Sequence, residues 1–135
     1  MRPRLALSIG AVFNVLFGLP LVLAPAQMLS AFGWPATPNV GLVPARDAGV
    51  LLIGVGIIDW LARDAVGAPL RGLLWGNIFI RFAAMAVNGW ELAAGIIPTT
   101  ALTAFGGLLV PIAFGPNIAL IVMFALALRR AQEGA

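Results

Sequence analysis

The side chains with the clearest chemical potential in this chain are one arginine, one aspartate and several asparagines set inside apolar segments. Arg81 lies near the middle of the apolar run Leu73–Trp90, and Asp59 lies near the end of the apolar segment before it. A cation at the centre of a bilayer is costly and is usually held for a structural or functional reason. Arg81 therefore marks the first place to look for a binding or catalytic site.

Other polar residues lie at about the same depth in the predicted helices as Arg81. At roughly 1.5 Å per residue, Asn14, Arg81 and Asn117 each lie roughly 13–18 Å from the same end of their helices. Asn77 precedes Arg81 by one helical turn. We therefore predict an interior polar site for a lipophilic or anionic small molecule, formed by Arg81, Asp59, Asn14, Asn77 and Asn117.

The sequence leaves more than one possible partner for the Asp59 carboxylate. Helical side chains tilt toward the N-terminus, so Asp59 and Arg81 lean toward each other from antiparallel helices. Arg63 follows Asp59 by four residues and competes for the same carboxylate. A third partner is the remaining alternative.

The same residues are compatible with several classes of function. A ligand-binding or accessory membrane subunit is the main hypothesis, and a buried ion pair that fixes helix register is its purely structural counterpart. A membrane enzyme, of isomerase or hydrolase type, would use Asp59 with Arg81 on a lipophilic substrate. A transporter would require several copies, since four helices form a small pathway.

Missing residue types exclude much other chemistry. The chain contains no Cys, His or Lys, which removes thiolate, imidazole and Schiff-base chemistry. We therefore expect no metal and no cofactor. The net charge of +3 comes from arginine alone and is interpreted as a topology signal, with no nucleic acid as partner.

Composition sets the class of the protein that must position these side chains. The chain of 135 residues is 61% hydrophobic and 10% charged, with a mean hydropathy of +1.04. Too few polar groups remain to cover a soluble globule, so an integral membrane protein is predicted. We expect a single all-α domain, residues 1–135, with four transmembrane helices at about 5–24, 45–63, 71–91 and 109–129.

Proline and glycine mark the connections. Residues 25–44 contain four prolines and are expected to form an interfacial loop, with a short helix over Ala26–Phe32. We expect Gly115-Pro116 to interrupt the fourth helix. Residues 95–107 would form an outer loop, a re-entrant turn or a helical extension. Glu91 is expected at a membrane interface, with a place at the mouth of a ligand site as the alternative.

Arginine placement predicts the orientation. Arg46 falls on one side of the four predicted spans, and six arginines fall on the other: Arg2, Arg4, Arg63, Arg71, Arg129 and Arg130. Positive residues concentrate on the cytoplasmic side of membrane proteins. Both termini are therefore expected in the cytoplasm.

Small and polar residues form stripes that predict where the helices touch. The first stripe contains Gly10, Asn14 and Gly18, and the third contains Asn77, Arg81 and Asn88. The second stripe comprises Ala45, Gly49, Gly56, Asp59 and Arg63. Small residues allow helices to approach closely in a bilayer. Apolar character alone does not favour a neighbouring helix there, because the lipid tails are equally apolar.

The segments GLPLVLAP and ARDAGVLLIGVGIIDWLAR resemble those of small bacterial four-helix membrane proteins in the broad DoxX-like group. The resemblance implies a four-helix bundle in the bacterial inner membrane. It carries over no catalytic residue. The expected partners are the lipid bilayer, a lipophilic small molecule, and either further copies of the chain or a larger membrane complex.

Overall fold

The structure is a computed structural model that describes residues 1–34, 41–97, 101, 103 and 109–133, except for the side chains of 109–113. All of the regular structure in these residues is helical, as predicted. The principal elements in chain order are α1 (Pro3–Leu23), α2 (Pro25–Ala31), α3 (Leu42–Leu61), α4 (Gly67–Ala93) and α6 (Leu109–Glu133).

Three described helical segments are long and apolar enough to cross a membrane. They are Pro3–Leu23, Gly67–Ala93 and Phe114–Glu133. Helix α3 has 20 residues but also carries Arg46, Asp47 and Asp59, so each of its 18-residue stretches holds three charged residues. Length and composition therefore identify three candidate spans.

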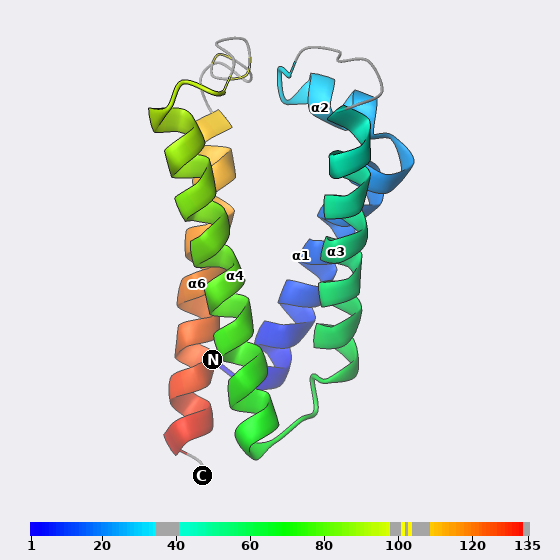
Figure 1. The fold of residues 1–135 in the computed structure, drawn as a ribbon. Coiled ribbons are helices and arrows are strands. Elements are labelled where there is room, and N and C mark those ends of the chain that lie inside the picture. Colours follow the sequence, from blue (N-terminus) through cyan, green and yellow to red (C-terminus); the bar gives the residue numbers. More distant parts are fainter. Residues whose placement is uncertain (35–40, 98–100, 102, 104–108, 134–135) are drawn as a thin grey trace.

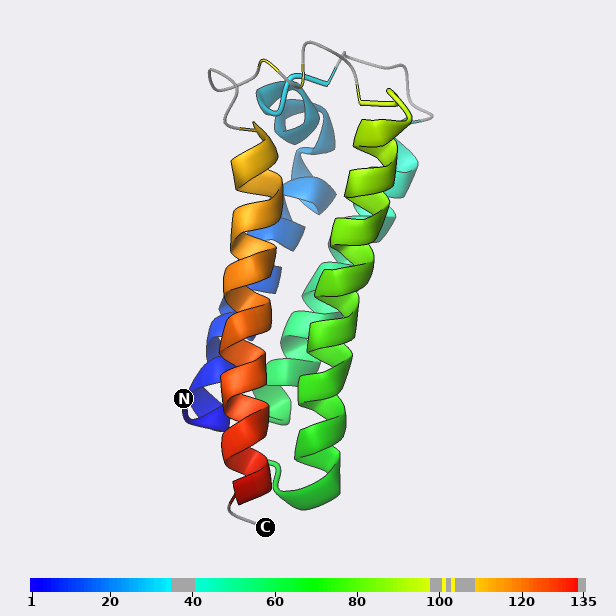
Figure 2. The same cartoon turned by 90° about the vertical axis from the view of Figure 1, so that its left-hand side faces the viewer.

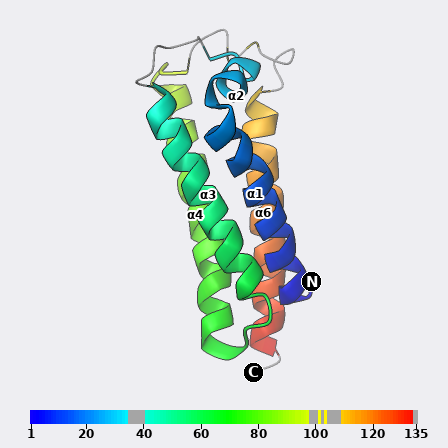
Figure 3. The ribbon, with the colours of Figure 1, turned by 90° about the vertical axis from the view of Figure 1, so that its right-hand side faces the viewer.

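The long helices form two pairs, α1 with α3 and α4 with α6 (Figure 1). Helix α1 also contacts α6, which lies in front of it in Figure 2. The start of α1, the turn between α3 and α4, and the end of α6 lie at one end of the molecule (Figures 1 and 3). Helix α2 lies at the other end, where the two pairs are further apart.

The α1–α3 pair is held by close backbone contact at small residues. A Cβ atom added to Gly18 would lie 2.7 Å from the Gly49 carbonyl oxygen, and one added to Gly49 would lie 2.8 Å from that of Gly18. A Cβ on Gly56 would lie 2.9 Å from the Ala11 carbonyl oxygen. The predicted glycine stripes on the first and second helices are thus confirmed as a helix interface.

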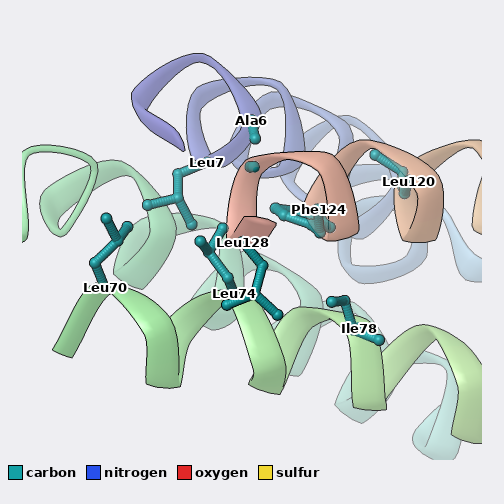
Figure 4. Close-up of a cluster of buried hydrophobic side chains, with 9 residues drawn as sticks. Ala6, Leu7, Leu70, Leu74, Ile78, Leu120, Phe124 and Leu128 are labelled. Atoms are coloured by element: carbon teal, nitrogen blue, oxygen red, sulfur yellow. The ribbon is translucent and has the colours of Figure 1, made fainter. Parts of the chain in front are cut away.

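A buried apolar cluster joins the two pairs near the α1 N-terminus (Figure 4). It fills the space between α1, α4 and α6, and Phe124 and Leu74 are completely buried in it. Its members are Ala6, Leu7, Leu70, Leu74, Ile78, Leu120, Phe124, Ala127 and Leu128. This apolar cluster therefore connects α1 to the α4–α6 pair at this end of the molecule.

The structure corrects three local expectations. Helix α6 continues through Gly115-Pro116, so the predicted interruption is wrong. A single proline removes one backbone donor, and neighbouring structure can preserve the helical path around it. Helix α3 begins at Leu42, three residues before the expected start, and ends at Leu61, which leaves Arg63 outside the helix.

The remaining boundaries differ from the predicted ones by a few residues. The expected helices at 5–24 and 71–91 correspond to α1 and to a longer α4, and the expected fourth helix extends to Glu133. The short helix expected over Ala26–Phe32 is present as α2. Most of the segment 95–107 lies outside the described residues, as do residues 35–40.

Candidate functional site

Four polar side chains are buried together among α1, α3 and α4. The exposed fraction is 0% for Asn14, 1% for Asp59, 4% for Asn77 and 5% for Arg81. Burial of two charged residues is costly unless their polar atoms find partners. These four residues are called the polar cluster below.

Amide groups mediate the contacts of both charged residues. Asn77 Nδ2 donates a hydrogen bond of 2.8 Å to Asp59 Oδ1 and also lies 3.1 Å from the Leu73 carbonyl oxygen. Arg81 Nη2 donates to Asn14 Oδ1. No ion pair joins Asp59 to Arg81. The direct pairing considered from the sequence is therefore wrong, and the partner of Asp59 is Asn77.

Arg63 is also not the partner of Asp59. Its Nη1 donates to the Trp60 carbonyl oxygen at 2.6 Å, and its Nε lies 3.9 Å from Asp64 Oδ2. Its guanidinium stacks over the Trp60 ring, 4.3 Å from the ring centroid. Because α3 ends before Arg63, the helical spacing that would direct its side chain toward Asp59 is lost.

Helix geometry explains why these polar groups meet. Asn77 and Arg81 are four residues apart, so they share one face of α4. On the facing pair of helices, a Cβ atom on Gly10 would lie 3.4 Å from Asp59 Oδ2, and one on Gly56 would lie 3.3 Å from Asn14 Cβ. Glycine at both positions leaves room for the carboxylate and the amide.

Within the described residues, four buried atoms of the polar cluster have no protein hydrogen-bond partner. Two are donors, Asn14 Nδ2 and Arg81 Nε, and two are acceptors, Asp59 Oδ2 and Asn77 Oδ1. A buried polar atom without a partner destabilises a fold by more than a bonded one stabilises it. The cluster therefore has hydrogen-bonding capacity beyond what the helices need to pack.

A cavity of about 430 Å³ adjoins the polar cluster at Arg81. Its walls come from both helix pairs and from α2, which lies at the end where the pairs diverge. Most of its surface is apolar, with an aromatic and aliphatic wall that includes Phe13, Phe17, Leu21, Leu29, Phe32 and Trp34. Its volume lies within the range of small-molecule sites, roughly 300–1,000 Å³.

The few polar groups of this cavity are distributed along its length. Arg81, Ala84, Asn88 and Glu91 line it from α4 at successive turns, and Asn117 lines it from α6. Ten residues of helix separate Arg81 from Glu91, which corresponds to about 15 Å. The Arg81 guanidinium lies 5.4 Å from the centroid of Phe13, whose ring stacks on Phe17 at 4.6 Å. Arg81 is thus a cationic group in a mostly apolar wall.

The structure brings all five sequence-predicted site residues into one region. Asn14, Asp59 and Asn77 belong to the polar cluster, Asn117 lines the cavity, and Arg81 belongs to both. The predicted site did not include Asn88 or the α2 wall, and Glu91 was placed at a ligand site only as an alternative. The spacing of Asn88 and Glu91 from Arg81, seven and ten residues, was the available signal.

The described residues contain no group of three or more acidic side chains placed to hold a metal ion. Comparisons with protein-family models, with curated proteins and with solved structures found no match to this chain. The site is therefore interpreted from its own geometry.

Proposed function

We propose that this chain is a four-span membrane protein that binds a lipophilic small molecule in the cavity beside Arg81. One observation carries the proposal: Arg81 is 95% buried, is hydrogen-bonded to Asn14 and lines a cavity whose surface is mostly apolar. A site of this kind holds an apolar body in its walls and recognises one polar group of the ligand. Arg81 supplies that recognition.

The exposed surface supports a fourth membrane span at α3. Large apolar side chains, including Val50, Leu51, Ile57 and Ile58, are exposed on this helix. Asp59 is buried inside the bundle, and Arg46 and Asp47 lie near the helix start, where charges reach the membrane interface. We therefore propose that α1, α3, α4 and α6 all cross the bilayer.

The arginine distribution supports the orientation. The end of the molecule that carries the start of α1 and the end of α6 also carries Arg4, Arg63 and Arg129. By the positive-inside rule this end faces the cytoplasm, so the cavity lies toward the outer face. A bacterial inner membrane is the location that the DoxX-like resemblance implies.

The geometry favours ligand binding over catalysis. An enzyme of isomerase or hydrolase type needs an acid or base that touches its substrate. Asp59 is 1% exposed, its Oδ1 accepts a hydrogen bond from Asn77 Nδ2, and it is not among the residues that line the cavity. Asp59 therefore has no route to a ligand in this cavity.

The proposal is tested with Trp34, which lines the cavity, as a fluorescent reporter. Trp60, Trp75 and Trp90 are all exposed and are replaced with Phe, and the chain has no Tyr. The protein is placed in lipid nanodiscs and titrated with dodecanoate or dodecanol brominated on the terminal carbon. At least one probe is expected to quench Trp34 fluorescence in a saturable way.

Filling the cavity provides the control. Ala84→Phe adds a ring inside the cavity and is expected to abolish saturable quenching, whereas Ala86→Phe adds the same ring on an exposed position of α4 and leaves it intact. Absence of saturable quenching with both probes, or equal quenching in the Ala84→Phe protein, refutes the proposed function.

A further inference from the structure

We infer that the ligand of this cavity is a single-chain anionic amphiphile, with its acid group at Arg81 and its chain extending toward Trp34. This inference rests on the proposed function and adds to it the class of ligand and the direction in which it lies. Three features of the cavity support it: the charge of Arg81, the shape of the walls and the position of Glu91.

Arg81 lines the cavity and forms no salt bridge with a described carboxylate. Its closest polar partner is the neutral amide of Asn14, and the only carboxylate of the polar cluster is bonded to Asn77 instead. A guanidinium binds carboxylate and phosphate oxygens through charge-assisted hydrogen bonds, which strengthen where water is excluded.

The walls fit one apolar chain. From Arg81 to Glu91 the cavity extends over about 15 Å of α4, at 1.5 Å per residue. Its walls are aromatic and aliphatic. They contain few polar groups beyond four side chains, those of Arg81, Glu91, Asn88 and Asn117. A volume of about 430 Å³ lies in the lower part of the range for ligand sites, which suits one chain of medium length better than a two-chain lipid.

Glu91 sets the direction of the ligand. This carboxylate lines the end of the cavity opposite Arg81, together with Trp34 and Leu92 from the α2 and α4 ends. An acid group at that end would meet a like charge, while the same group at Arg81 meets an opposite one. The acid group therefore lies deep in the cavity, and the end of the chain lies beside Trp34.

The experiment compares an acid with its alcohol in the Trp34-only protein in nanodiscs. Terminally brominated dodecanoate is expected to bind at least about tenfold more tightly than terminally brominated dodecanol, as a hydrogen bond to a charged group would give. Arg81→Gln is expected to remove this preference. Arg130→Gln, which removes an exposed arginine of α6, is expected to preserve it.

Bromine position tests the direction. Dodecanoate brominated on its terminal carbon is expected to quench Trp34 more strongly at saturation than dodecanoate brominated beside the carboxylate. Phosphate and carboxylate groups share the same chemistry toward Arg81. Titration with dodecyl phosphate as a further probe distinguishes a phosphate head group from a carboxylate. Folding of each variant is checked by circular dichroism and gel filtration.

The outcomes separate this inference from the proposed function. Equal or tighter binding of the alcohol, with loss of binding in Ala84→Phe, refutes the anionic ligand and leaves the lipophile site standing. Stronger quenching by the bromine beside the carboxylate refutes the direction. Absence of binding by every probe refutes the proposed function itself. If Arg81→Gln does not fold, the comparison of dodecanoate with dodecanol in the protein that retains Arg81 still decides whether the ligand is anionic.

Discussion

At the scale of single residues, the decisive feature is that each of the two buried charged groups is hydrogen-bonded to an amide, Asp59 to Asn77 and Arg81 to Asn14. Sequence reasoning identified Arg81, Asp59 and the asparagines, because charged and amide side chains are conspicuous in apolar helices. It did not identify Asn77 as the partner of Asp59. That outcome depends on where α3 ends and on rotamers at the helix contact, which a residue count along the chain does not contain.

Replacing Asn77 tests the importance of its bond to Asp59. Asn77→Leu removes the donor to Asp59 Oδ1 at a position that is 4% exposed, and leaves a buried carboxylate oxygen without a partner. We expect a loss of about 1–3 kcal/mol in the free energy of unfolding. The measurement is reversible unfolding in mixed micelles followed by circular dichroism.

The matched control for this substitution is Asn88→Leu, on the same helix. Asn88 is half-buried and takes part in none of the hydrogen bonds of the polar cluster, so we expect a smaller change in stability. An equal loss in both proteins would mean that the Asn77–Asp59 bond adds nothing to the fold.

At the scale of helices, glycine positions determine which helices pair. The sequence stripes correctly indicated a close contact between α1 and α3, where Gly18 of α1 meets Gly49 of α3 and Gly56 of α3 meets the α1 backbone at Ala11. The expected break at Gly115-Pro116 was wrong, since proline and glycine indicate where a helix can bend but the surrounding packing decides whether it ends.

Two glycines of α3 provide a test with an internal control. A Cβ atom on Gly49 would lie 2.8 Å from the Gly18 carbonyl oxygen, whereas one on Gly54 would have no neighbour within 4 Å. We expect Gly49→Ala to destabilise the protein by about 1–3 kcal/mol through overpacking. We expect Gly54→Ala to be neutral or slightly stabilising, because alanine has the higher helix propensity. Unfolding measurements that rank the two variants the other way would contradict the α1–α3 interface.

At the scale of the whole molecule, the cavity arises from how the two helix pairs are joined. The apolar cluster holds them together at one end, and α2 lies over the other (Figures 1 and 4). The all-helical class follows from composition, and the segments themselves follow from hydropathy. The cavity does not, because the divergence of the pairs and the place of α2 depend on packing between residues far apart in the sequence.

The central claim is that a positive charge lies inside a cavity reached from the outer face of the membrane. The most direct test is thiol labelling of Ala84→Cys, since Ala84 lines the cavity one helical turn from Arg81 and the chain has no other cysteine. In intact cells, we expect a membrane-impermeant anionic methanethiosulfonate to label this thiol. Labelling should be faster than with the cationic reagent and should be slowed by dodecanoate.

The exposed Ala86→Cys position of α4, which faces away from the cavity, serves as the control and should show no protection by dodecanoate. Absence of labelling at Ala84→Cys from outside, or faster labelling by the cationic reagent, would contradict the account.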